Sequence, residues 1–238
     1  MKRIEVLISA LAVFLICGSV GAGTMAVSSP FSGPVPSSST TVTLDQFDTL
    51  GGTRSLDSVT MNLNVDIGAD VTAENDSISP GSITTDLSGF ATVTFSTLST
   101  TATVAQSAGP VSVAATDGTP DSGPDFHDFG SISGNGSDTD LASSSLGPFI
   151  GTSTLNIPIT LSGGFNISGV SNSSLGLSNF SGTGTLELIY NYSDVVIPEP
   201  AAMSIGAVAA IGLLRRRRAT LAEVHRPAVR ALHEPPPF

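Results

Sequence analysis

The chain has 238 residues and a formal net charge of −11. Residues 27–199 contain seventeen Asp or Glu and a single base, Arg54, which gives this body a formal charge of −16. Nucleic-acid binding needs clustered Lys and Arg to displace counterions from phosphates, so the composition excludes that class and also disfavours binding to anionic lipid surfaces.

The N-terminus has the pattern of a secretory signal peptide. Lys2 and Arg3 precede an apolar run over residues 6–16, and small residues follow up to residue 26. Residues 1–26 are therefore predicted to be a signal peptide with a helical hydrophobic region, and cleavage after Ala22 or after Ala26 would suit a signal peptidase. The one cysteine, Cys17, lies within this segment, so we expect no disulfide in the exported chain.

The body of the chain alternates apolar and polar residues in several runs. Residues 27–39 are rich in Pro and Ser and are predicted to form an extended lead-in. The alternation is clearest from Val59 to Ile67 and recurs over residues 90–104, 154–167 and 183–196. Strands with one buried face and one solvated face give this pattern. We predict an all-β domain over residues 40–196, an antiparallel β-sandwich that is jelly-roll-like or related.

An acidic segment is the clearest candidate for a metal site. Calcium takes six to eight oxygen ligands, which a loop rich in carboxylates can partly supply. The spacing of the aspartates does not match an EF-hand, and a solvated acidic loop is the alternative. The candidate calcium ligands are Asp117, Asp121, Asp125 and Asp128.

Catalytic patterns are weak. His127 lies between two aspartates, an arrangement that can activate a serine. The sequence has no Gly-x-Ser-x-Gly elbow and no His-Glu-x-x-His zinc motif, however. We predict that the protein is not an enzyme and needs no cofactor, with calcium as the one candidate ion.

The C-terminal region has three ordered parts. Pro198, Glu199 and Pro200 precede an apolar run over residues 201–214, which ends at a cluster of four arginines, Arg215, Arg216, Arg217 and Arg218. This run is shorter than the roughly 20 residues of a bilayer-spanning helix, which favours a transiently inserted helix over a stable anchor. The arginines are expected to stay in the cytoplasm, which leaves the body outside. A plain membrane anchor is the alternative, and residues 219–238 are predicted to be a disordered extension.

These three parts resemble the PEP-CTERM sorting signal of Gram-negative and planctomycete-like bacteria. The resemblance implies that an exosortase, a membrane-embedded cysteine transpeptidase, recognises residues 197–218 and removes the tail near the motif. It implies that Pro198, Glu199 and Pro200 are the recognition segment. It also implies that the arginine cluster holds the helix in register.

The body carries a second resemblance, at both of its ends. Residues 44–59 contain Gln46-Phe47-Asp48, a Gly-Thr step and a Leu-x-x-Val strand start. Residues 180–184 read Phe-Ser-Gly-Thr-Gly, and Tyr190-Asn191-Tyr192 follows. These features resemble the choice-of-anchor E domain, which implies a β-rich exported module whose molecular activity is unknown.

The sequence thus predicts an exported bacterial protein of the cell surface, outer envelope or extracellular matrix, with a non-enzymatic structural or interaction role. Signal peptidase and exosortase are the expected partners during export. Extracellular polysaccharide or other surface proteins are the expected partners afterwards. The alternative is a glycan- or ligand-binding sandwich stabilised by calcium, although the chain has no tryptophan to form a sugar platform.

Overall fold

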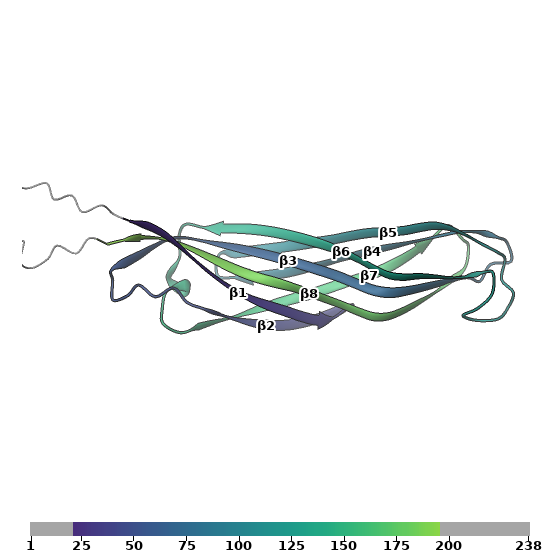
Figure 1. The fold of residues 1–238 in the computed structure, drawn as a ribbon, viewed down its shortest axis with the longest axis horizontal. Helices are drawn as coiled ribbons and strands as arrows, with labels where there is room; N and C mark the ends of the chain where they lie inside the picture. Colours follow the sequence, from purple (N-terminus) through teal and green to yellow (C-terminus); the bar gives the residue numbers. More distant parts are fainter. Residues whose placement is uncertain (1–20, 196–238) are drawn as a thin grey trace, which may run out of the picture. The chain divides into compact units, whose positions relative to one another are not determined.

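The computed structural model describes residues 21–195, which form two antiparallel four-stranded sheets. Sheet A has the strand order β1-β8-β3-β6 and sheet B the order β2-β7-β4-β5 (Figure 1). The strands are β1 (Ala22–Pro34), β2 (Ser37–Asp45), β3 (Arg54–Asn75), β4 (Gly81–Phe95), β5 (Leu98–Val113), β6 (Phe126–Ala142), β7 (Thr154–Ser168) and β8 (Ser173–Asp194). A 3-10 turn, η1 (Gly147–Phe149), precedes β7. The predicted antiparallel β-sandwich is confirmed, whereas both predicted flanking helices lie outside the described residues.

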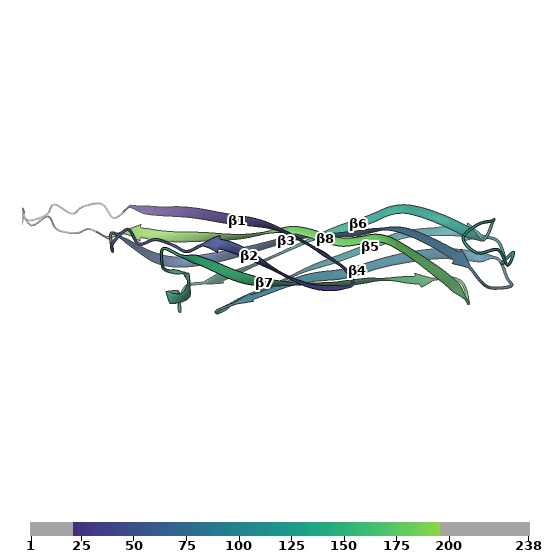
Figure 2. The ribbon, with the colours of Figure 1, turned by 90° about the horizontal axis from the view of Figure 1, so that it is seen from below.

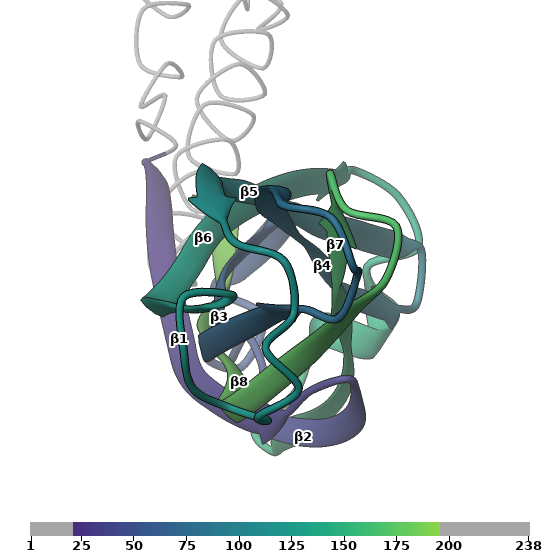
Figure 3. The ribbon, with the colours of Figure 1, turned by 90° about the vertical axis from the view of Figure 1, so that its right-hand side faces the viewer.

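The core lies between the two sheets and follows the alternation in the sequence. Val59, Met61 and Leu63 of β3 are fully buried, and Ile157 and Ile159 of β7 are fully buried in the same cluster. Burying one such side chain contributes about 1.5–3 kcal/mol relative to leaving it exposed. The polar residues between them face solvent, which gives each sheet one apolar and one wet face. Figure 3 shows the two sheets end-on.

The domain begins earlier in the chain than the sequence indicated. Residues 27–39, expected as a lead-in, lie in β1, in the bend at residues 35–36 and in the first part of β2, and β1 also includes residues 22–26 of the predicted signal peptide. Met25, Val27 and Phe31 of β1 pack against the core between small and polar neighbours. β1 is an edge strand, where proline is tolerated because one side of its backbone needs no ladder partner.

Both ends of the described chain lie at one end of the sandwich. Ala22 pairs with Ser193, and the Asp194 N–H donates to the Gly21 carbonyl at 2.8 Å. The opposite end is formed by the loops that join β3 to β4, β5 to β6, and β7 to β8 (Figure 2). We call these loops, residues 76–80, 114–125 and 169–172, the distal tip.

Side chains close the edge where the two sheets meet at β5 and β6. The Ser99 N–H of β5 donates to Asp140 Oδ2 at 2.8 Å, and the Thr101 N–H donates to Asp138 Oδ2 at 2.6 Å. Gly136 allows close approach, because a Cβ there would lie 2.1 Å from the Thr103 carbonyl oxygen. Carboxylates thus take the place of a backbone ladder at this β5–β6 seam.

Candidate functional site

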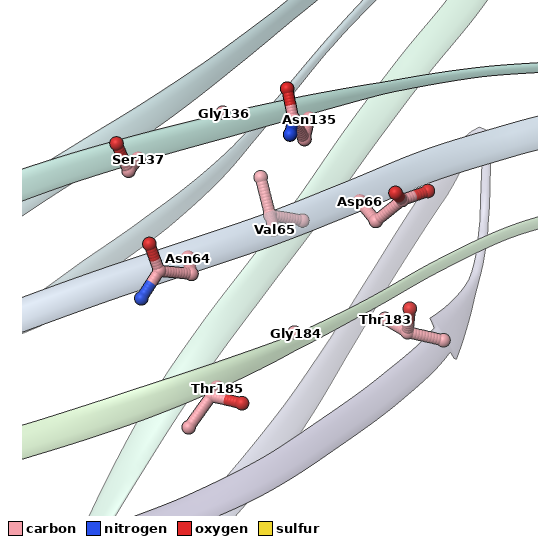
Figure 4. Close-up of a pocket in the computed structure, with 9 residues that line it drawn as sticks. All are labelled: Asn64, Val65, Asp66, Asn135, Gly136, Ser137, Thr183, Gly184 and Thr185. Carbon is pink, nitrogen blue, oxygen red and sulfur yellow. The ribbon is translucent and has the colours of Figure 1, made fainter.

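A polar groove crosses the outer face of sheet A. Three residues from β6, β3 and β8 form its floor, with their backbones side by side: Gly136, Val65 and Gly184. Two rows of exposed side chains flank the floor, as Figure 4 shows: Ser137, Asn64 and Thr185 on one side, and Asn135, Asp66 and Thr183 on the other. Same-face residues two apart in a strand are separated by about 6.6–6.8 Å, which sets the width of the groove. Its volume is about 450 Å³.

The polar groups of this groove are open to a ligand. In the neighbouring row, the Asn62 amide donates to Glu187 Oε2 at 2.9 Å and accepts from the Thr139 hydroxyl at 3.0 Å. Among the described residues, no such side-chain hydrogen bonds join the two rows that flank the groove. A second hollow shares the β8 residues Thr183, Gly184 and Thr185 and continues to β1 and β2. The surface therefore offers amides, hydroxyls and one carboxylate, Asp66, to a polar molecule.

The groove was missed in the sequence because its three strands are far apart in the chain. The sequence feature that could have indicated the groove was glycine inside strands, which often marks a place where another backbone or a ligand approaches closely. At Gly184 a Cβ would lie 2.2 Å from the Asn64 carbonyl oxygen and 2.4 Å from the Phe31 ring. Glycine is thus needed there for β8 to pack against β3 and β1.

The candidate calcium ligands are distributed unevenly over the distal tip and β6. Asp125 is fully buried, and its Oδ2 accepts the Asp117 N–H at 2.9 Å. The Asp121 N–H donates to Glu74 Oε2 at 2.9 Å. Asp128 Oδ1 accepts the Gly130 N–H at 2.8 Å at the start of β6. Within residues 21–195, no group of three or more His, Cys, Asp or Glu side chains is arranged to hold a metal ion.

His127 lies in an apolar contact. Its ring packs edge-on against Phe129, with centroids 4.6 Å apart. In the described part of the chain, none of the side-chain hydrogen bonds involves the imidazole, so the structure gives no geometric support to the serine-activating arrangement considered from the sequence.

The sorting residues Pro198, Glu199 and Pro200 and the cluster Arg215–Arg218 lie outside the described residues, as does the predicted extension over residues 219–238. Within residues 21–195, no helix has the length and apolar character needed to cross a membrane.

Comparisons with known proteins give no family for this chain. No family model matches it, and no curated protein matches it. A solved structure of infectious bursal disease virus, Gt strain, matches at 13% identity over 83% of this chain and 48% of the viral chain, with a TM-score of 0.12. The T13 particle of the same virus matches at 11% identity over 85% and 48%, with a TM-score of 0.14. The chain spans about half the length of these viral chains, and likenesses this slight carry no conclusion.

Proposed function

We propose that this chain is an exported bacterial protein of the cell surface or extracellular matrix, sorted through a PEP-CTERM signal and non-enzymatic. The observation that carries the proposal is the pair of targeting patterns, residues 1–26 and 197–218, on either side of a polyanionic β-rich body. We also infer the jelly-roll type for the sandwich, because eight strands in two four-stranded sheets of this order fit that architecture.

The position of the chain ends supports this proposal. Gly21 and Asp194 are joined by a backbone hydrogen bond, so both targeting segments connect to one end of the sandwich. A body attached in this way can present its distal tip and the outer faces of both sheets away from the attachment point. A structural or interaction protein of a surface layer needs such free faces.

The sorting route is tested by intact-mass analysis of the protein recovered from the surface or medium of its bacterial host. The mass is expected to lack the apolar run and the arginine cluster. Replacing Pro198, Glu199 and Pro200 together with alanine should leave an unprocessed form in the membrane. The matched control replaces Glu234, Pro235 and Pro236 in the same way and should be processed normally. A mature protein that retains residues 201–218 would make this chain a plain membrane-anchored protein.

A second candidate function is glycan or polar-ligand binding in the groove of sheet A. The open rows flanking Gly136, Val65 and Gly184 favour it, because hydroxyls, amides and a carboxylate are the groups that hydrogen-bond sugar hydroxyls. The groove has no aromatic residue among those that line it, so recognition would depend on hydrogen bonds.

Glycan-array binding separates the two candidates. Thr185→Arg should abolish any binding, because the long side chain fills the groove. Thr160→Arg on the exposed face of β7, in the other sheet, is the control and should leave binding intact. Absence of sugar binding by the wild-type chain would leave the structural role alone, and binding that survives Thr185→Arg would place the ligand elsewhere.

A further inference from the structure

At the distal tip, the β5–β6 loop folds over the end of β3. The Asn75 N–H donates to the Asp125 carbonyl at 3.0 Å. The fully buried Asn75 amide donates to the carbonyls of Ser79 and Ala114, at 2.9 Å and 2.6 Å. Buried Glu74 accepts the Asp121 N–H. These bonds fix the loop and place the Asp125 side chain inside the tip.

Within residues 21–195, the Asp125 carboxylate is buried without a Lys or Arg beside it. Its exposed fraction is 0%, and while Oδ2 accepts one backbone N–H, the buried Oδ1 has no hydrogen-bond partner among these residues. Arg54 is the one Lys or Arg between residues 27 and 199, and it is the first residue of β3, whereas Asn75 at the tip is the last. An ionised carboxylate in such a place is strongly unfavourable unless a cation or a proton neutralises it.

A second carboxylate faces the same space. A Cβ built on Gly123 would lie 2.8 Å from Asp125 Oδ1 and 2.3 Å from Asp117 Oδ2. Both distances start from one point, so the two oxygens are at most about 5 Å apart. Two oxygen ligands of the same Ca²⁺ ion, each about 2.3–2.6 Å from it, are also at most about 5 Å apart. The backbone of Gly123, at φ +94°, leaves this space free of a side chain.

We propose that Asp117 and Asp125 bind one calcium ion over Gly123, and that this ion closes the β5–β6 loop, whose Asp125 carbonyl accepts the N–H of Asn75 at the end of β3. The ion neutralises the buried Oδ1 and the facing Asp117 Oδ2, while Asp117 Oδ1 accepts the Thr119 N–H at 2.8 Å. Water and backbone carbonyls complete the six to eight oxygens that calcium takes. With only two carboxylates, the affinity falls in the range of extracellular calcium modules, a dissociation constant of about 0.1–1 mM. The site is independent of the proposed sorting route, because all of its residues lie in the sandwich.

Thermal unfolding of the full chain, freed of metal with EDTA and dialysed, tests this proposal. In 10 mM CaCl₂ the melting temperature should rise by about 3–8 °C over NaCl of equal ionic strength, because binding to the folded state alone shifts the folding equilibrium. Titration calorimetry with CaCl₂ on the same sample should give one site. No binding up to 10 mM, or equal melting temperatures in the two salts, would overturn the proposal.

Variants locate the ion. Asp125→Asn should remove the calcium response and raise the melting temperature of the metal-free protein, since it deletes an uncompensated buried charge. Asp117→Asn should also remove the response. Asp128→Asn, on the exposed start of β6, is the control with the same charge change and should respond like wild type. If Asp125→Asn still responds, or if Asp128→Asn loses the response, the site is wrongly placed.

The Asp117→Asn variant keeps the test decisive where Asp125→Asn does not fold, because Asp117 is exposed. A calcium response of Asp117→Asn equal to that of wild type would show that Asp117 does not bind the ion. That result would overturn the calcium assignment, even if the Asp125→Asn variant fails to fold.

Discussion

The Tyr190 hydroxyl donates a 2.8 Å hydrogen bond to the backbone carbonyl of Asp45, which joins β8 of sheet A to the end of β2 in sheet B. The Tyr190 ring is fully buried and lies 5.8 Å from the ring of Phe47, between centroids. This contact ties the two sheets together near the end where the chain enters and leaves. Burial, together with the nearby Asp45 carboxylate, raises the pKa of Tyr190 above its ordinary value.

Tyr190→Phe should destabilise the sandwich by about 1 kcal/mol, because it removes one hydrogen bond and leaves the Asp45 carbonyl without that donor. The melting temperature should fall by about 2–4 °C. Tyr192→Phe is the control, because the Tyr192 ring packs against Phe47 and under Arg54, and within residues 21–195 its hydroxyl donates no hydrogen bond. Equal losses in the two variants would show that the bond to Asp45 contributes nothing.

Alkaline pH should reveal the raised pKa of Tyr190. Tyrosine in the unfolded chain ionises near pH 10.0, whereas Tyr190 in the folded chain keeps its proton to higher pH. The stabilisation is therefore fully present below pH 10 and is lost as pH rises above it. Urea unfolding between about pH 9 and 11.5 should show a steeper loss for wild type and Tyr192→Phe than for Tyr190→Phe. Three identical slopes would contradict this assignment.

Removing a carboxylate from the β5–β6 seam should expose the edge of sheet B. Asp138→Ala leaves the Thr101 N–H without its acceptor, at a cost of about 1 kcal/mol. An edge with free backbone groups can pair with another chain, so self-association should also increase. Light scattering after mild heating measures this association. Asp57→Ala removes an exposed carboxylate that, among the described residues, accepts a hydrogen bond from the Ser193 hydroxyl alone. This variant is the control and should stay monodisperse to the same degree as wild type.

On the proposed export route, signal peptidase should cut after Ala22 and not after Ala26. Cleavage at the later position would remove residues Gly23–Ala26, which pair with β8, and with them Met25, which packs against the core. N-terminal sequencing of the exported protein should begin at Gly23. A start at Val27 would mean that the mature sandwich folds with a shortened β1.

The sequence predicted the strands that supply most of the core. In β3 and β7 one face carries large apolar side chains and the other carries polar ones. Apolar residues therefore recur at every second position from Val59 to Ile67 and from Leu155 to Leu161. β1 was missed because Phe31 is its only buried inward position, the others being partly buried, and because prolines interrupt the pattern. Such a strand forms because the edge of β8 is available to it, which is a tertiary effect.

The sequence likewise revealed part of the candidate sites and missed the rest. The acidic loop was evident as a run of aspartates, but the sequence does not reveal that Asp125 is buried while Asp128 lies on an exposed position. That difference arises because Asn75 and Ala114 draw the loop inward. The groove depends on the register of three strands, which no local pattern encodes.

The pairing of Gly23 with Tyr192 also determines how the mature body responds to mechanical force. If Gly23 and Val195 are pulled apart, the hydrogen bonds between β1 and β8 break one after another, because the load acts on one pair of residues at a time. If the chain is held at Val195 and loaded at the distal tip, the force runs along β8 and β3, whose 22-residue strands share the load over many bonds at once. We expect single-molecule pulling to give a much higher rupture force in the second geometry than in the first.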